Sequence, residues 1–281
     1  MNQDSFRPGG WTLLPTVIKN LLILNGIFFL ATITFQNAFN VDLIDMLGLH
    51  YFAAEKFAPY QFITYMFMHG GFTHIFFNMF ALWMFGRVLE NIWGPRRFIT
   101  YYLITGIGAA LVHYIVFYIE VMPVLNAIER FQNDPSIPAF KAFLNSEHFQ
   151  VISYEIQNEF NQFRNEFNNL VATNEHKALQ LAVDYMSRYK TSFLNQPVVV
   201  GASGAVFGIL LAFGMLFPNS VLYIYFALPI KAKYFVIIYG AIELYSGFAD
   251  TGGNVAHFAH LGGMLFGFIM LKYWKYTNKL F

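Results

Sequence analysis

Long apolar stretches separated by short polar segments dominate this chain. Six of them have about the 17–25 residues that a helix needs to cross a hydrocarbon core of about 30 Å. They lie near residues 16–36, 71–92, 98–120, 200–217, 232–249 and 255–273, and the fifth is interrupted by Glu243. The pattern predicts an all-α, polytopic membrane protein with six membrane helices. We expect the first helix to be retained, because no small-residue cleavage site follows it.

Lys and Arg residues predict the orientation of these helices. With a cytoplasmic N-terminus, Arg96, Arg97 and Lys275 fall on the cytoplasmic side, whereas the short outer loops carry only Lys56. Basic residues favour the cytoplasmic side of a membrane. We therefore expect a multi-pass membrane protein with both termini in the cytoplasm. Spans two, four and six then run from the outside to the inside.

The connection between the third and fourth spans, residues 121–196, differs from the rest of the chain. It is rich in Asn, Gln, Glu and Phe, and two sets of apolar residues recur at helical spacing. These sets are Phe160, Phe163, Phe167 and Leu170, and Leu179, Ala182, Val183 and Met186. We expect two or three amphipathic helices that form an outer-side insertion within a single membrane domain of residues 1–281. A solvated cap, a lid or substrate-docking element, and a membrane-surface helix all fit this pattern.

Composition supports a membrane protein and narrows its chemistry. Hydrophobic residues make up 57% of the chain and charged residues 12%, whereas soluble domains average roughly 25% charged residues. The net charge of +1 gives no reason to expect a nucleic-acid partner. The chain has no Cys, which excludes disulfides and thiolate metal sites.

Polar residues of hydrolytic chemistry stand near the start of three predicted spans. His74 and Asn78 lie a few residues into the second, Ser203 into the fourth and His260 into the sixth. With a rise of about 1.5 Å per residue, all would lie roughly 5–10 Å below the outer surface. Polar residues at such a depth are costly and are therefore candidates for function.

Ser203 and His260 form the first candidate pair. A serine hydroxyl becomes a good nucleophile when a base accepts its proton. Each of the two spans also carries a Gly-xxx-Gly face that allows close helix packing, formed by Gly204 and Gly208 and by Gly263 and Gly267. Close packing would permit a hydrogen bond of about 2.6–3.2 Å between the two side chains. Because neither Asp250 nor Glu243 is suitably placed in the sequence to orient His260, we expect a Ser-His dyad.

Five further residues are assigned supporting, alternative or structural roles. His257, one turn before His260, is an alternative base or a supporting group. Phe207, one turn after Ser203, could stack on the histidine ring. His69 precedes the second span and could shape the entrance to the site. Near the inner surface, Arg87 and Glu90 are expected to form a structural ion pair.

His74 and Asn78 lie four residues apart and share one helix face. Both can donate a hydrogen bond to an oxyanion, and so can the backbone N–H of Ser203. Each such donor contributes roughly 3–4 kcal/mol of transition-state stabilisation. Hydrogen bonding to neighbouring helices is the alternative role of both side chains.

Taken together, these motifs resemble the rhomboid family of intramembrane serine proteases. The resemblance rests on His69-x4-His74-x3-Asn78, Gly201-x-Ser203-Gly204 and Ala259-His260-x2-Gly263-x3-Gly267, and it covers residues 11–120 and 197–275. It implies a six-helix bundle in which Ser203 is the nucleophile and His260 the general base. His74, Asn78 and the Ser203 N–H would form the oxyanion hole. It also implies a protein of the cell (inner) membrane that cleaves transmembrane protein substrates in the lipid bilayer without a cofactor. The 121–196 insertion is longer than the family's minimal connection.

Two other functions fit parts of the sequence. His69, His74, His257 and His260 could hold a metal ion in the membrane, although that function leaves Ser203 and Asn78 unexplained. A non-enzymatic relative could instead bind membrane clients through the same groove. The protease function accounts for all three motifs, and it needs no metal.

Overall fold

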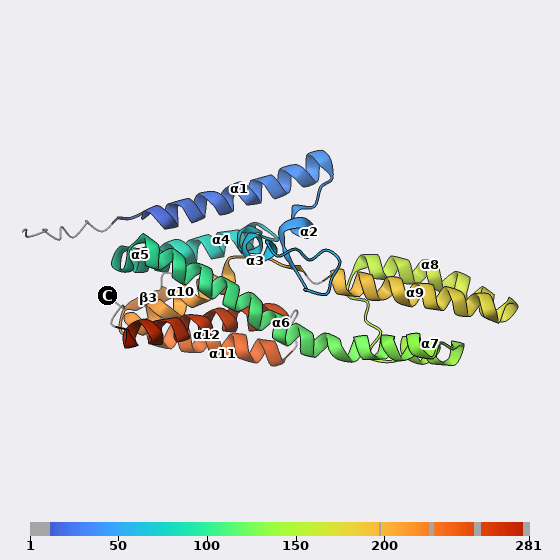
Figure 1. Ribbon diagram of the computed structural model, residues 1–281. Helices are drawn as coiled ribbons and strands as arrows, with labels where there is room; N and C mark the ends of the chain where they lie inside the picture. Colours follow the sequence, from blue (N-terminus) through green and yellow to red (C-terminus); the bar gives the residue numbers. More distant parts are fainter. Residues whose placement is uncertain (1–11, 197, 225–227, 250–253, 278–281) are drawn as a thin grey trace, which may run out of the picture.

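The chain folds into a bundle of roughly aligned helices with a helical extension at one end (Figure 1). The computed structural model describes residues 12–196, 198–224, 228–249 and 254–277. The bundle contains the following helices: α1 (Thr16–Phe39), α4 (Phe72–Ala81) continued by η2 (Leu82–Gly86) and α5 (Arg87–Trp93), α6 (Pro95–Asn133), α10 (Ser203–Leu216), α11 (Ala232–Phe248) and α12 (Asn254–Tyr276). Each of the six predicted spans thus corresponds to a helix.

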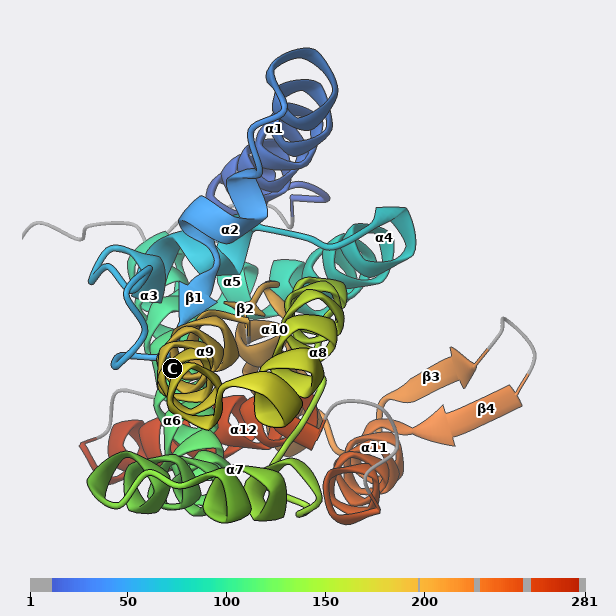
Figure 2. The same ribbon diagram turned by 90° about the vertical axis from the view of Figure 1, so that its right-hand side faces the viewer.

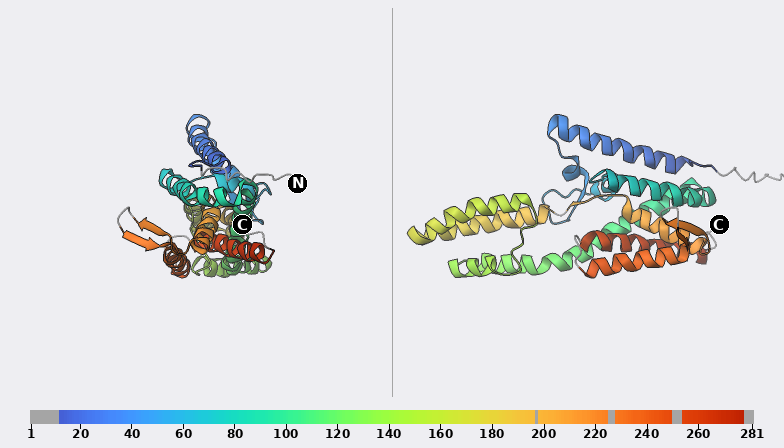
Figure 3. Two further views of the ribbon diagram at one scale, coloured as in Figure 1. Left: turned by 90° about the vertical axis from the view of Figure 1, so that its left-hand side faces the viewer. Right: turned by 180° about the vertical axis from the view of Figure 1, so that it is seen from behind.

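Three of the described helices are long and apolar enough to cross a membrane: Thr16–Phe39, Phe72–Trp93 and Pro95–Asn133. Many apolar side chains on the outside of the bundle are exposed, such as Ile27, Ile237 and Phe248. Outward-facing apolar side chains are what a lipid environment requires. α1 stands apart from the other helices along much of its length (Figure 3), which leaves most of its apolar surface free to contact lipid.

The predicted length of the fourth span is wrong. The sequence predicts a membrane helix over 200–217, but α10 has 14 residues and begins only at Ser203. Residues Val198–Val199 instead form strand β2, which pairs antiparallel with β1 (Leu49–His50). A 14-residue helix is about 21 Å long, so Ser203 is the first residue of its helix rather than a few residues inside it.

Glycine contacts hold α10 and α12 together at the centre of the bundle. A side chain on Gly263 would overlap the backbone of Gly204, and one on Gly267 would lie 3.3 Å from the Cα of Gly208. The prediction that the two glycine faces bring these helices close together is therefore confirmed. α6 covers the other side of α12, where Phe266 packs over Gly108.

The extension consists of the second half of α6 together with α7 (Ile137–Leu144), α8 (Tyr154–Thr173) and α9 (Glu175–Asn195). We call residues 121–196 the cap. α6 continues through Pro123 without ending at the predicted boundary of residue 120. Phe163 and Phe167 of α8 are buried together with Ala182 and Met186 of α9, and they continue the hydrophobic core of the bundle into the cap. Figure 2 shows the cap helices in front of the bundle, at the end opposite the start of α1 and the end of α12.

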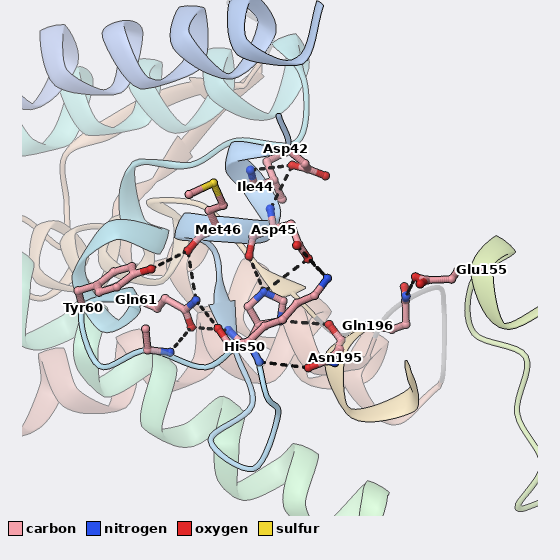
Figure 4. A network of polar contacts seen from close by, with 12 residues as sticks. Asp42, Ile44, Asp45, Met46, His50, Tyr60, Gln61, Glu155, Asn195 and Gln196 are labelled. Atoms are coloured by element: carbon pink, nitrogen blue, oxygen red, sulfur yellow. Dashed lines mark hydrogen bonds and ion pairs between the residues drawn. The ribbon is translucent and has the colours of Figure 1, made fainter. Parts of the chain in front are cut away.

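A polar network joins the cap to the loop between the first two spans (Figure 4). This loop contains α2 (Leu43–Leu47), β1, α3 (Gln61–Thr64) and η1 (Tyr65–Phe67). The fully buried ring of His50 lies 2.6 Å from the carbonyl oxygen of Asp45 and 3.1 Å from that of Asn195, the last residue of α9. Lys56 contacts the Asp45 carboxylate at 2.8 Å. The network fixes the cap just before the strand that leads to Ser203.

Between α10 and α11 the chain forms an antiparallel hairpin of β3 (Val221–Ile224) and β4 (Leu228–Lys231). The hairpin projects sideways next to α11 (Figure 2).

Glu90 has a different structural role from the predicted one. The described residues show no ion pair between Glu90 and Arg87, whose guanidinium instead lies over the ring of Trp83. The buried Glu90 carboxylate accepts hydrogen bonds from the backbone N–H groups of Val17 and Ile18, both at 2.8 Å. These two groups lie in the first turn of α1, where N–H groups have no partner within the helix. Glu90 thus anchors the start of α1.

Candidate active site

Ser203 is held at the N-terminus of α10 by an unusual backbone. Gly201 has φ +123°, a conformation that side-chain-bearing residues rarely adopt, and its N–H donates to the carbonyl of Tyr65 at 2.9 Å. A Cβ on Gly201 would also lie 2.8 Å from the ring of His74. This turn ends the β2 segment and starts the helix, so the Ser203 side chain and backbone N–H both lie at a positively polarised helix end.

Ser203 and His260 are in hydrogen-bond contact. The Oγ atom of Ser203 lies 2.8 Å from Nε2 of His260. No contact between His257 and Ser203 occurs among the described residues, so His260 is the histidine that can accept the serine proton. The glycine contact between α10 and α12 places the two side chains at this distance.

The expectation that no carboxylate is suitably placed to orient His260 is wrong. Oε2 of Glu243, on α11, lies 2.9 Å from Nδ1 of His260 and 2.7 Å from Nδ1 of His257. Glu243 is buried, with 6% of its surface exposed. Its position in the fifth apolar stretch was a usable signal, because an acidic residue within a membrane helix needs a polar partner.

Aromatic rings cover the other side of the site. The ring of Phe207 stacks on His260 with 4.2 Å between centroids and 5° between planes. Tyr239 of α11 stacks in turn on Phe207, with 5.0 Å between centroids. The sequence indicates the Phe207 contact from its spacing, but it gives no sign of Tyr239, whose distance along the chain is too large for a periodicity argument.

His74 and Asn78 face the same pocket as Ser203. The pocket has a volume of about 480 Å³ and is lined by Thr73, His74, Phe77, Asn78, Ala81, Ser203, Val206, Phe207, Tyr239 and His260. Asn78 donates one hydrogen bond from Nδ2 to the carbonyl of His74 at 3.0 Å, and an amide has a second N–H to offer. The buried ring of His69 packs edge-on against His74, with 4.9 Å between centroids. Side chains from α4, α10, α11 and α12 thus meet in one pocket.

One group of side chains in the part of the chain that the structure describes has the composition of a metal site. It comprises Glu243, His257 and His260, whose ligand atoms all lie within 4.8 Å of one another. His69 and His74 do not belong to this group, so the four-histidine site considered from the sequence is not assembled. The distances of 2.7 and 2.9 Å fit hydrogen bonds from two imidazole N–H groups to one carboxylate oxygen.

Comparison with known proteins identifies the family to which the chain belongs. The family model described as Rhomboid domain matches residues 56–120 and 161–276, more than half of the chain. The chain belongs to the rhomboid family. The matched segments include all the residues of the pocket and omit the first part of the cap.

Rhomboid-like protein 11, chloroplastic, from Arabidopsis thaliana is similar to part of this chain. It is 37% identical over 98 residues, which cover 33% of this chain and 34% of the plant protein. This match therefore spans about a third of the length of that relative. Together with the long apolar helices, the family places this rhomboid among membrane proteins.

Proposed function

We propose that this rhomboid is an intramembrane serine endopeptidase that cleaves membrane-anchored protein substrates. The observation that carries the proposal is the 2.8 Å contact between Ser203 Oγ and His260 Nε2 at a pocket shared with His74 and Asn78. Nucleophile, base and candidate oxyanion donors are thus present together, as acyl transfer requires. Rhomboid family proteins act on membrane protein substrates within the bilayer.

The reaction would proceed in two steps. His260 Nε2 accepts the hydroxyl proton while Ser203 Oγ attacks the carbonyl carbon of the scissile peptide bond. The oxyanion receives hydrogen bonds from the Ser203 N–H and from the His74 and Asn78 side chains. His260 then gives its proton to the leaving amine, which leaves an acyl-enzyme. Water hydrolyses this ester with His260 again acting as the base.

The arrangement of the helices supports a six-span topology. The start of α1 and the end of α12 lie at one end of the bundle, and the cap lies at the other (Figure 1). With both termini in the cytoplasm, the cap and the Ser203 end of α10 lie toward the outer face. α10 would then begin within the membrane, below the loop that carries β1. The cap is then an extramembrane insertion, within one membrane domain, that stands above the site.

A fluorophosphonate probe tests the proposed function in purified, detergent-solubilised protein. The probe reacts with activated serines, so we expect the parent to be labelled and Ser203→Ala and His260→Ala to lose at least about 100-fold in labelling rate. Ser187→Ala is the matched control, because Ser187 lies exposed in the cap and bonds only to the carbonyl of Val183 among the described residues.

Cleavage itself requires a second assay. The parent and Ser203→Ala are reconstituted into liposomes with a single-span test substrate, and the cleaved fragment is measured. A protease gives a fragment with the parent alone. Client binding that is equal in both proteins, without a fragment or probe labelling, would instead identify a non-enzymatic binder.

A further inference from the structure

The mechanism above leaves one buried charged group without a role. Glu243 lies on α11, whereas both of its partners, His257 and His260, lie on α12. A single oxygen, Oε2, accepts from both rings. A buried carboxylate is costly unless it is hydrogen-bonded, and here two imidazole N–H groups meet that need.

These contacts determine which nitrogen of His260 carries the proton. A carboxylate oxygen is only an acceptor, so the facing Nδ1 of His260 must be the donor. In neutral imidazole the other nitrogen is then unprotonated. That nitrogen, Nε2, lies 2.8 Å from Ser203 Oγ. Glu243 therefore selects the tautomer in which His260 can accept the serine proton.

The same carboxylate faces the positive charge that the reaction creates. When the Ser203 hydroxyl proton moves to Nε2, the Oγ electron pair forms the new bond and His260 becomes an imidazolium. Glu243 stays ionised, and the proton on Nδ1 does not leave. A negative charge 2.9 Å from Nδ1 stabilises this imidazolium, and the burial of Glu243 strengthens the interaction.

α11 holds the base directly through one residue and indirectly through a second. Glu243 bonds to the edge of His260, and Tyr239, one turn earlier, stacks on Phe207, which itself covers the face of His260. His257 holds the same carboxylate oxygen from a second direction at 2.7 Å. The ring of His260 is therefore fixed in its plane by Glu243 of α11 and across its face by Phe207 of α10, which Tyr239 of α11 supports from behind.

We propose that Glu243 is a positioning residue that completes a Ser203–His260–Glu243 triad, with His257 as the second anchor of the carboxylate. The proposal rests on the protease function proposed above. It gives α11 a part in orienting the base, and it assigns the base from the direction of its hydrogen bonds.

The test compares Glu243→Gln with the parent in the rate of fluorophosphonate labelling as a function of pH. In this reaction Oγ bonds to phosphorus and fluoride leaves, so no natural substrate is needed. Gln retains the size of the side chain but removes the charge. We expect labelling at pH 7.5 to fall at least about ten-fold, and at most roughly 10⁴-fold, the loss when an orienting Asp is replaced by Asn in a serine protease triad. The acidic limb of the rate curve is also expected to move, because Gln places no negative charge beside Nδ1 of His260.

Other titratable groups near His260 stay unchanged in this comparison. They are His257 on α12, Tyr239 on α11, His74 on α4 and Tyr65 on η1. Glu90→Gln is the matched control, since Glu90 is also buried and also accepts two hydrogen bonds. It is expected to lower the melting temperature without moving the acidic limb.

Several outcomes would overturn the proposal. A folded Glu243→Gln that labels within two-fold of the parent, with the same pH curve, would make Glu243 a structural residue only. EDTA that changes parent labelling, but not that of Glu243→Gln, would assign the cluster to a metal ion. Ser203→Ala separates the two proposals, because its loss of labelling depends on the nucleophile and not on Glu243.

A measurement on the parent covers the case in which Glu243→Gln does not fold. Nitrogen NMR of ¹⁵N-histidine-labelled protein, with the His260 signals assigned by their loss in His260→Ala, reports which ring nitrogen carries the proton. Protonated Nδ1 and bare Nε2 in the neutral ring are expected. Protonated Nε2 would mean that His260 donates to Ser203, and the proposed triad would be wrong.

Discussion

Gly263 on α12 lies so close to Gly204 on α10 that a methyl group at Gly263 would overlap the Gly204 carbonyl oxygen. Ser203 directly precedes one of these glycines, and His260 lies one turn before the other. The separation of the two helices at this contact therefore sets the distance between Ser203 Oγ and His260 Nε2. The close packing of α10 against α12 therefore determines the geometry of the site as well as the fold.

Gly263→Ala is expected to disrupt both stability and labelling. The new methyl group meets backbone atoms, which cannot rotate away, so α10 and α12 must move apart. Overpacking of this kind costs about 1–3 kcal/mol, and we expect labelling by the fluorophosphonate probe to fall at least about ten-fold. Gly26→Ala is the control, because no atom lies within 4 Å of a Cβ at that position of α1. Parent-like labelling by Gly263→Ala would show that the contact is not needed for the Ser203–His260 distance.

Gly201→Ala tests the turn before Ser203. Alanine is strained at φ +123°, and its Cβ would lie 2.8 Å from the His74 ring. We expect a loss of about 1–3 kcal/mol in stability, measured by thermal unfolding in detergent. Adding His74→Ala removes the ring but not the backbone strain. The double variant should therefore remain less stable than His74→Ala alone, and equal stability would mean that the ring contact is the whole effect.

The Ser203–His260 contact can be predicted because the glycines that indicate it lie close to Ser203 and His260 in the sequence. Glycines at i+1 and i+5 from Ser203, and at i+3 and i+7 from His260, indicate the two faces that pack together. The same reasoning misses Glu243. Helical spacing shows which residues share a face, but it does not show which neighbouring helix that face meets. The partners of Glu243 are 14 and 17 residues away on another helix.

The prediction for Glu90 fails for the same reason. Arg87 is close in sequence, whereas the N–H groups that Glu90 binds are 72 and 73 residues away. The start of α10 shows a second limit. Apolar residues continue through Val198–Val200, but the pairing of β2 with β1 and the positive φ of Gly201 delay the helix to Ser203. Hydropathy measures apolar length and does not distinguish a strand from the first turn of a helix.

Tyr189 gives the cap a measurable dependence on pH. Its buried hydroxyl accepts the N–H of Gln150 at 2.9 Å and donates to the Gln150 carbonyl at 3.1 Å. Burial raises the pKa of Tyr189 to about 12, while the hydrogen bond with the Gln150 backbone opposes this rise. Because the ordinary pKa is about 10, the stabilisation is fully present below pH 10 and is lost as the pH rises toward 12.

Tyr189→Phe should weaken the attachment of the connection between α7 and α8. Loss of the two hydrogen bonds costs about 1–3 kcal/mol, and limited proteolysis at pH 8 should cut residues 145–153 faster than in the parent. The variant should also lose less stability between pH 10 and 12, although burial also raises the pKa of Tyr185 and part of the effect remains. Tyr154→Phe is the control, since Tyr154 is 81% exposed. Equal cleavage of both variants would show that the Tyr189 hydroxyl does not hold the connection.

Phe207 supplies the aromatic face on which His260 lies, and Phe207→Leu tests what that face contributes. Leucine retains an apolar side chain but removes the parallel ring at 4.2 Å. Aromatic pairs contribute about 0.5–1.5 kcal/mol beyond their buried area, so we expect labelling to fall about 2–10-fold, with Phe207→Tyr close to the parent. Phe213→Leu is the control on the same helix, because its ring packs against Phe85 outside the pocket. If Phe207→Leu labels like Phe213→Leu, the hydrogen bonds of His260 to Ser203 and Glu243 are sufficient to orient the ring, and the stacking only fills space.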